Sequence, residues 1–343
     1  MSSLTRLFVP QLRAVQIWGA ENGAGKTIAS TILTWAAARR PRRDKNRMVV
    51  FLKPFNVGKG DTSEFLVRSA ISKLLAGRHR PEWLKIQSLV HWPEWETSEE
   101  AMDTEGPGDR EDAEKSRTMD GRTEEWSEAP AYDELDLHLM KPIRNFLIQK
   151  SKGLPPPGGW VFMETLGSPE TRLPWGLNQA DAYACSNLTS SNVLVGVASK
   201  QGGDKIIAAC EALRARNLSV HGAMVFRDSD EAQHERVAAY FEELRVPCAM
   251  LRAIPARHPD ARKDSRIMGD FFRAMAAYHP VQSLMHNVNR RHQLEIFERL
   301  AEPTDETEKE YLKLARSEVQ RPLPKDVILA ADIQEDIIKR FRV

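Results

Sequence analysis

The sequence has few cysteines. Its 343 residues include three, Cys185, Cys210 and Cys248. They are odd in number and far apart, and no cysteine or histidine flanks them at metal-site spacing, which argues against a disulfide framework and a structural zinc site. We therefore expect reduced, partly buried thiols in an intracellular protein.

Long hydrophobic runs and an excess of one charge are also missing. No apolar stretch approaches the roughly 18 residues that mark a membrane-spanning helix. Forty-nine basic side chains against 48 acidic ones leave a formal charge of +1, so no general attraction to nucleic acid or to an anionic membrane is expected. The length fits about two domains or one large α/β unit.

Short apolar runs with helical patterns between them dominate the rest. The runs do not alternate with polar residues, which is typical of strands covered on both faces. The six runs are Ala14–Trp18, Met48–Leu52, Trp160–Met163, Val193–Val197, Val220–Phe226 and Cys248–Leu251. The helical patterns are Thr27–Arg39, Glu64–Leu75, Asp133–Gln149, Lys205–Arg216 and Asp230–Leu244. This alternation predicts an α/β fold: a doubly wound, mostly parallel sheet with helices on both faces and ligands beyond the carboxyl ends of the strands.

Two regions depart from that rhythm. Glu96–Glu128 is acidic, poor in apolar residues and interrupted by glycine and proline, which is typical of a disordered, solvated segment. The chain beyond Leu300 is helical and charged, with Tyr311 and Leu314 among the apolar residues of one face; it could pack on the domain or on a second copy. We predict a main domain over residues 1–300, with an insertion at 96–130, and a helical tail over 301–343.

The segment Gly19–Thr27, GAENGAGKT, follows a predicted strand and opens a predicted helix. Its glycines let the backbone wrap around oxygens, and the new helix presents its N–H groups and partial positive charge. Lys26 can reach the β- and γ-phosphates, and the Thr27 hydroxyl is the expected Mg²⁺ ligand. The loop predicts binding of ATP phosphates by Gly19, Asn22, Gly23, Ala24, Gly25, Lys26 and Thr27.

A metal-bound triphosphate needs further carboxylates. Glu164 ends an apolar run, where an acid can face magnesium directly or through water, although a surface residue beginning a turn is the alternative. Asp61, beyond the second run, could supply a second carboxylate, but aspartate is also a frequent turn residue. Lys53, at the end of its predicted strand, would face the same edge of the sheet as Lys26.

Five motifs in order resemble dethiobiotin synthetase, most closely the synthetase part of the bifunctional eukaryotic enzymes that also carry diaminopelargonate aminotransferase. They are LRAVQIWGAENGAGKT, FLKPFNVG, VFMETLGSP, LVGVASKQGG and IAACEALRARNLSVHGAMVF. MHNVNRRHQLEIFERL resembles the segment leading toward the aminotransferase part. The resemblance spans about Leu12 to Leu300 and implies a P-loop NTPase-like fold.

The resemblance also implies a reaction and roles. The family carboxylates 7,8-diaminopelargonate with CO2 at the expense of ATP and closes the ureido ring of dethiobiotin. Carried over by motif, Thr27, Asp61 and Glu164 are the magnesium ligands. Lys26 and Lys53 contact phosphate and carbamate, and Ser199 lies near the diamine; these three are the implied catalytic residues.

Several positions differ from the family pattern. The acid of the usual phosphate loop has moved, giving Glu21-Asn22-Gly23-Ala24, and the glycine pair after Glu-Thr becomes Leu166–Pro169, which can block a backbone donor. Phe226-Arg227-Asp228 replaces the asparagine that helps to read adenine in bacterial relatives. Phosphate and metal positions therefore match better than substrate positions.

These differences leave three functions open. The first is an ATP- and Mg²⁺-dependent dethiobiotin synthetase, homodimeric as the family is, with small-molecule substrates only. The second is a catalytically degenerate nucleotide-binding homologue that acts as a switch or partner subunit. The third is a ligase for another amine or carboxylate on the same scaffold.

The compartment is open as well. Arg6 and Arg13 precede the first acid, Glu21, a transit-like composition, although the first predicted strand leaves little presequence to remove. The family resemblance suggests the mitochondrion, with the cytoplasm as the alternative.

Overall fold

The computed structural model describes residues 8–38, 48–57, 84–92, 140–154, 158–173, 177–185, 190–300, 306–320 and 333. The predicted helix Glu64–Leu75 and the predicted insertion at 96–130 lie outside these residues, and so does Asp61.

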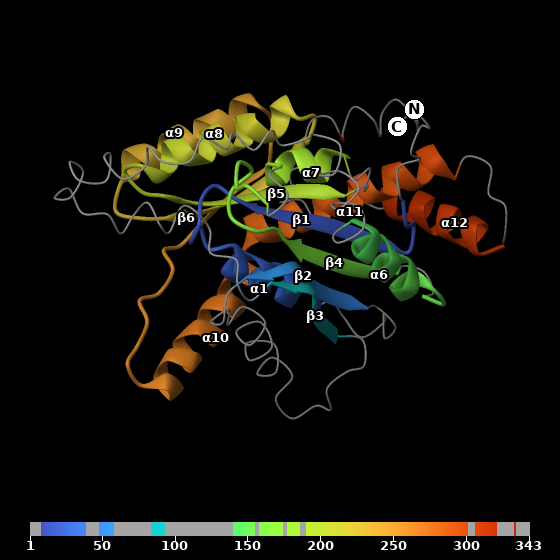
Figure 1. Ribbon diagram of the computed structural model, residues 1–343, viewed down its shortest axis with the longest axis horizontal. Coiled ribbons are helices and arrows are strands. Elements are labelled where there is room, and N and C mark those ends of the chain that lie inside the picture. Colours follow the sequence, from blue (N-terminus) through green and yellow to red (C-terminus); the bar gives the residue numbers. More distant parts are fainter. Residues whose placement is uncertain are drawn as a thin grey trace, which may run out of the picture.

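A seven-stranded sheet forms the centre of the molecule (Figure 1). Every neighbouring pair of strands is parallel, in the order β3-β2-β4-β1-β5-β6-β7. The strands are β1 Leu12–Gly19, β2 Val49–Val57, β3 Leu84–Trp92, β4 Gly159–Glu164, β5 Ser191–Ala198, β6 Val220–Arg227 and β7 Cys248–Leu251. From β1 the chain passes to β2 and β3 on one side of the sheet, and from the neighbouring β5 it passes to β6 and β7 on the other side. This change of direction confirms the predicted doubly wound sheet and places the loop that follows β1 beside the crevice where such sheets bind ligands.

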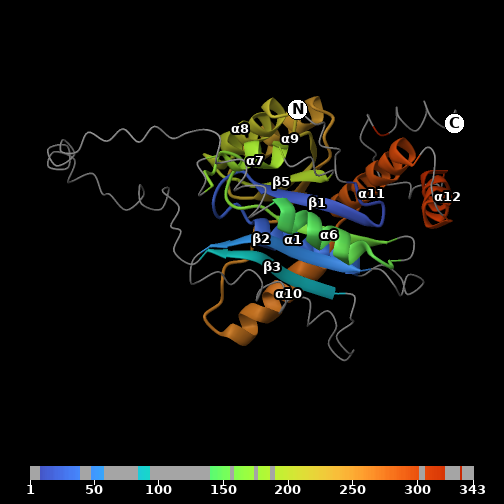
Figure 2. The ribbon, with the colours of Figure 1, turned by 45° about the vertical axis from the view of Figure 1, so that its right-hand side comes forward.

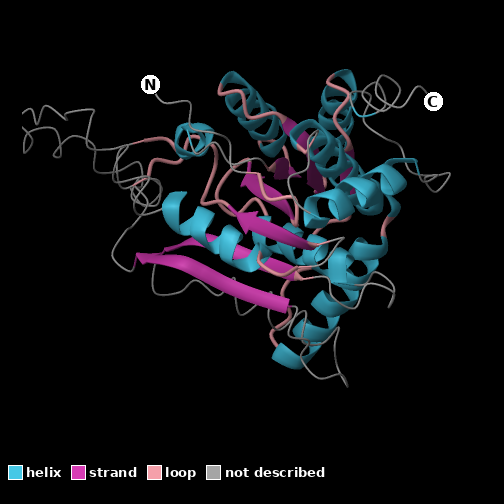
Figure 3. Cartoon of the chain, turned by 90° about the vertical axis from the view of Figure 1, so that its right-hand side faces the viewer, coloured by secondary structure: helices cyan, strands magenta, loops and turns pink. Residues whose placement is uncertain are grey.

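Helices cover both faces of the sheet (Figures 1 and 2). They are α1 Lys26–Ala38, α6 Lys141–Ser151, α7 Gln179–Cys185, α8 Gly202–Ala215, α9 Glu231–Glu243, α10 Ala261–Ala277, α11 His279–Arg299 and α12 Glu306–Gln320. Two buried clusters result, because successive strand residues point to opposite faces. Trp18 and Met163 pack with α6, α7, α8 and α9, whereas Ile17 and Phe162 pack with α1, α10 and α11. Figure 3 shows the sheet between these helices.

Two strands differ from the prediction. β3 was not among the six apolar runs, because its sequence, LKIQSLVHW, mixes polar and apolar residues. It lies at the edge of the sheet and pairs with β2 alone, so it needs no continuous apolar run. β2 also runs on to Val57, so Lys53 lies within the strand and not at its end.

The tail helix α12 packs on the main domain. Tyr311 and Ala315 are buried against Ile296 and Leu300 of the preceding segment, and the Tyr311 hydroxyl donates to the Leu154 carbonyl oxygen at 3.0 Å. Leu314 is only half-buried. The tail thus adds a small cluster to the domain, and the proposed boundary at residue 300 remains a prediction.

All three cysteines are free thiols. Burial raises the pKa of Cys185 and Cys210, and that of Cys248 to about 12, which makes each a weak nucleophile at neutral pH. Within the described part of the chain, no helix is both long and apolar enough to cross a membrane.

Candidate functional site: the loop between β1 and α1

The loop after β1 bends tightly back into the first helix. Gly23 and Gly25 adopt φ angles of +73° and +85°, a region that side chains disfavour. A Cβ atom on Gly25 would lie 3.0 Å from Cε2 of Phe226, so the loop rests directly on the end of β6. The loop therefore ends where the unpaired N–H groups of α1 begin, which is the arrangement that binds anions.

Lys26 lies across the mouth of the loop. Its Nζ donates to the carbonyl oxygen of Gly167 at 3.0 Å, so the first residue of α1 is held against the loop that follows β4. Gly19 makes room for this side chain, because a Cβ atom there would lie 2.8 Å from Lys26 Nζ and 3.0 Å from Gly167 O. A cation is thus positioned beside the backbone amides of the loop, where phosphate oxygens are bound in sites of this kind.

Glu164 is the buried acid of the site. It ends β4, is 3% exposed, and accepts hydrogen bonds from Thr27 Oγ1 at 2.9 Å and Ser30 Oγ at 3.3 Å. Lys53 Nζ lies 4.0 Å from Glu164 Oε1. The pairing of Leu52 with Met163 brings β2 alongside β4 just before these two residues, so Lys53 and Glu164 meet although Lys53 lies within its strand.

The loop Thr165–Ser168 is fixed by side chains of a later segment. Gln179 is fully buried; its Oε1 accepts from Leu166 N at 2.7 Å, and its Nε2 donates to the carbonyl oxygens of Leu166 and Ser168. Ser168 N donates to Thr171 Oγ1 at 2.8 Å. These hydrogen bonds on both sides of Gly167 fix the position of the carbonyl group that accepts from Lys26.

A second ion pair joins the β1–α1 loop to α8. Lys205 of α8 donates to Glu21 Oε2 at 2.5 Å, and both side chains are partly exposed. Exposed pairs of this kind add little stability. Glu21, the acid of the β1–α1 loop, therefore points toward α8.

Ser199 lies in the turn between β5 and α8. β5 is the neighbour of β1 in the sheet, so this turn follows the strand beside the β1–α1 loop. Ser199 Oγ accepts a hydrogen bond from Gly202 N at 3.1 Å, so it supports the start of α8. A hollow of about 640 Å³ separates this turn from the segment after β6, and Asp228, Asp230 and Glu231 line its other side.

The donor set suits a hard cation beside an anion. The Thr27 hydroxyl and the Glu164 carboxylate supply oxygen ligands, which Mg²⁺ prefers, and Mg²⁺ commonly keeps several waters and takes further ligands from phosphates. Among the described residues, no group of three or more His, Cys, Asp or Glu side chains comes together, so these residues make no closed metal cage of their own.

The structure brings together Lys26, Thr27, Lys53 and Glu164 of the predicted set, and Ser199 lies at the neighbouring strand end. Three contributors were missed in the sequence. Ser30 follows Thr27 by three residues, so helical spacing could have found it. Gly167 lies in the segment Leu166–Pro169 that departs from the family pattern, but its contact with Lys26 joins distant segments. Nothing in the local sequence of Gln179 marks it.

No protein-family model matches the chain. The chain is 27% identical over 256 residues, 74% of its length, to the bifunctional dethiobiotin synthetase/adenosylmethionine-8-amino-7-oxononanoate aminotransferase of Emericella nidulans. This similarity confirms the resemblance based on the five motifs. The match spans 27% of that relative, about a quarter of its length. Among solved structures, the cell division ATPase MinD of Pyrococcus furiosus matches 90% of this chain and 98% of its own, with 13% identity and a TM-score of 0.39.

Proposed function

We propose that this chain is an ATP- and Mg²⁺-dependent dethiobiotin synthetase, a cyclo-ligase of biotin biosynthesis. The observation that carries the proposal is the meeting of Thr27, Lys53 and the buried Glu164 at the mouth of the glycine loop, since phosphoryl transfer requires that charge be positioned at this kind of place. The motif order and the similarity to the bifunctional synthetase/aminotransferase supply the reaction class.

In the proposed reaction, one amine of 7,8-diaminopelargonate adds CO2 and gives a carbamate. The carbamate oxygen takes the γ-phosphoryl group of ATP and releases ADP. The second amine then attacks the carbamoyl carbon, phosphate leaves, and the ureido ring of dethiobiotin closes. Each step moves or disperses negative charge, which is the part of the work that cationic side chains and backbone amides can do.

The residues divide this work by position. The amides of the Asn22–Gly25 loop and the start of α1 bind the phosphates, and Lys26 exchanges its contact with Gly167 O for phosphate oxygens. Lys53, close to Glu164, faces the carbamate. Thr27 and Glu164 would hold Mg²⁺, which supplies positive charge to the phosphate oxygens when bound. Asp61 remains a proposed third ligand, and Ser199 a proposed contact to the diamine.

The test is phosphate release from ATP by the purified chain. Release should require both diaminopelargonate and bicarbonate, and Lys26→Ala should reduce it by about 10²-fold or more, since one preorganised charge contributes on that order. The chain should also restore growth without biotin to a strain that lacks dethiobiotin synthetase, and the Lys26→Ala variant should not. Phosphate release that is the same without the diamine would overturn the proposal.

One observation favours the second candidate, a degenerate nucleotide-binding homologue. The amides of Leu166 and Ser168 already donate to Gln179 and Thr171, so they offer no hydrogen bonds to a substrate at the positions where the family has glycines. A switch or partner subunit of this kind would bind ATP through Lys26 but ignore the diamine. Rescue of the biotin auxotroph would exclude it.

We also propose a homodimer of this chain and, by family resemblance, a mitochondrial location. Sedimentation of the purified chain and imaging of a tagged chain in its native cell test these two proposals separately from catalysis.

A further inference from the structure

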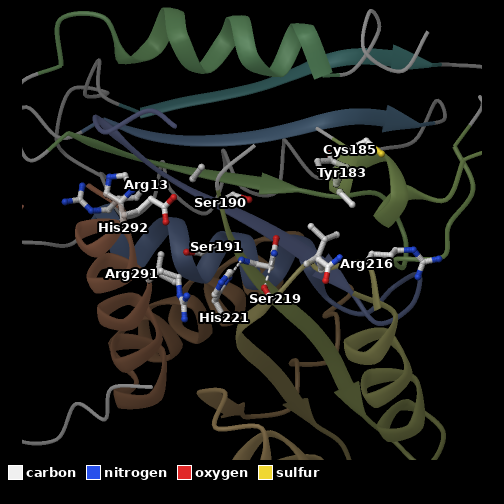
Figure 4. A pocket seen from close by; sticks show the side chains of 17 residues that line it. Arg13, Tyr183, Cys185, Ser190, Ser191, Arg216, Ser219, His221, Arg291 and His292 are labelled. Atoms are coloured by element: carbon white, nitrogen blue, oxygen red, sulfur yellow. Dashed lines mark hydrogen bonds between the residues drawn. The ribbon is translucent and has the colours of Figure 1, made fainter. Parts of the chain in front are cut away.

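A second cavity lies at the amino ends of the strands, on the other side of the sheet from the β1–α1 loop at their carboxyl ends. It has a volume of about 530 Å³ and is bordered by the first residues of β1, β5 and β6, together with α7 and α11 (Figure 4). The phosphate loop follows the other end of β1; Ala14 and Gly19 are five residues apart, about 16 Å at the rise of a strand. The volume is in the range of small-molecule sites, and none of the residues assigned to ATP, magnesium or the diamine lines it.

Cationic and hydrogen-bond-donating groups dominate the lining. Arg13, Arg216 and Arg291 come from β1, the end of α8 and α11, and Glu295 is the one carboxylate among the lining residues. Glu295 itself accepts from Arg299 Nε at 2.5 Å. Arg216 is bound to Asp181 and Glu170. Arg13 and Arg291 lie at the other end of the cavity from Arg216 (Figure 4). Arg13 Nε also donates to Asn289 Oδ1 at 2.5 Å, and its guanidinium carbon lies 5.4 Å from the centroid of the Trp160 ring.

Two histidines in the lining have lowered pKa values, in part because of the neighbouring arginines. Burial, and after it the positive charge of Arg13, lowers the pKa of His292 to about 3. Burial and Arg291 likewise bring the pKa of His221 well below its usual value. Both rings are therefore neutral at pH 7, and the arginines carry the positive charge of the cavity.

The floor is already organised by hydrogen bonds. The buried Asn192 accepts from Trp18 Nε1 at 3.2 Å, donates through Nδ2 to Ser219 O at 3.0 Å, and donates through its backbone N–H to His221 Nδ1 at 2.8 Å. A neutral imidazole that accepts at Nδ1 carries its proton on Nε2. His221 is thus a donor, and the hydroxyls of Ser191 and Ser219 in the lining can donate as well.

We propose that this cavity binds a small molecule that bears an oxyanion, either a carboxylate or a phosphate group. Guanidinium groups recognise both by charge-assisted hydrogen bonds, and a rigid, partly buried site strengthens them. Arg13 and Arg291 bind the anionic group, and the hydroxyls and His221 Nε2–H complete its hydrogen bonds.

Isothermal titration of the full chain tests this with two probes, malonate for carboxylates and inorganic phosphate for phosphates. The Lys26→Ala background removes the cation of the β1–α1 loop, so binding that persists there and is weakened by a substitution in the cavity belongs to the cavity. Arg291→Gln in this background should weaken that binding at least tenfold. Lys263→Gln, which removes an exposed cation from α10, should leave it within twofold.

A second variant guards against misfolding. Ala14→Leu fills the cavity without changing its charge and should also abolish binding, while the circular dichroism spectrum stays unchanged. Binding of malonate alone, or of phosphate alone, identifies the anion class. Failure of both probes to bind the Lys26→Ala protein overturns the proposal. So does binding by the folded Arg291→Gln and Ala14→Leu variants that is as tight as binding by the Lys26→Ala protein. Neither outcome affects the proposed synthetase activity, which Arg291→Gln should retain.

Discussion

Glu164 combines burial with charge, and its variants separate the two. Glu164→Gln keeps the size of the side chain and one oxygen that can accept from Thr27 or Ser30, but it removes the negative charge. Because a carboxylate attracts a divalent cation far more strongly than an amide does, the Mg²⁺ concentration for half-maximal ATP-dependent phosphate release should rise about tenfold or more. The measurement is a Mg²⁺ titration at fixed ATP.

Ser30→Ala is the matched control. Ser30 contacts the same carboxylate at its other oxygen, 3.3 Å away, and its loss leaves the charge in place. The Mg²⁺ requirement should stay within about threefold of the unchanged protein, while stability falls by about 1 kcal/mol for one lost hydrogen bond. An equal rise in the Mg²⁺ requirement for both variants would assign the effect to packing and not to charge.

His292 makes stability depend on pH. Its pKa is about 3 in the folded chain, against about 6.5 when exposed, so the unfolded chain binds the extra proton below pH 6.5. The stabilisation is fully present above that pH and is lost as the pH falls toward 3, by about 2 kcal/mol at pH 5.

Urea unfolding at pH 7 and pH 5 measures this loss. His292→Asn retains a side-chain donor toward Pro10 O, with which His292 Nε2 makes a hydrogen bond of 3.0 Å, but it cannot titrate. The fall in unfolding free energy between the two pH values should therefore be smaller in the variant. His221 shifts both proteins in the same direction, so the difference between them isolates His292. Identical falls would contradict the prediction.

At the scale of elements, the loop between β1 and α1 requires a backbone conformation that only glycine adopts readily. Gly25→Ala forces a side chain onto a residue with φ of +85° and places its Cβ 3.0 Å from Phe226. We expect a loss of about 1–2 kcal/mol in the free energy of unfolding, and at least tenfold weaker ATP binding measured by titration, because the loop amides move.

Gly269→Ala in α10 is the opposite case. Its Cβ would meet nothing within 4 Å, and alanine favours a helix interior over glycine by about 0.5–1 kcal/mol. This variant should be more stable than the original chain, with unchanged ATP binding. ATP binding by Gly25→Ala as tight as that of Gly269→Ala would refute the required loop conformation.

The predictability of each element follows from how it is buried. Strands covered on both faces, such as β1 and β5, have mainly apolar sequences that predict them within two residues. The edge strand β3 has no such sequence. In the site, Lys26 and Thr27 are predictable because their spacing is local. Gln179 is not, since its role depends on the loop it meets 13 residues earlier.

Across the whole molecule, the parallel sheet separates two polar sites. The β1–α1 loop lies at the carboxyl ends of the strands, and the arginine-lined cavity lies at their amino ends. β1 belongs to both, since its second residue, Arg13, lines the cavity and its last residue, Gly19, lies beside Lys26. A near-neutral total charge thus coexists with groups of cationic side chains at both ends of β1, which overall composition cannot indicate.

The tail helix tests whether residues beyond 300 belong to the same cooperative unit. Tyr311 is 2% exposed and donates to Leu154 O, near the end of α6. Tyr311→Ala should lower the free energy of unfolding by about 3–5 kcal/mol, as for other buried aromatic truncations, and Tyr311→Phe by about 1 kcal/mol for the lost hydrogen bond. Lys313→Ala, at an exposed position of the same helix, should change the free energy of unfolding by less than about 0.5 kcal/mol.

Denaturation followed by both fluorescence and circular dichroism should give a single coincident transition for the unsubstituted chain. Two transitions, with only the weaker one sensitive to Tyr311→Ala, would show that the tail folds separately and that its packing adds nothing to the main domain.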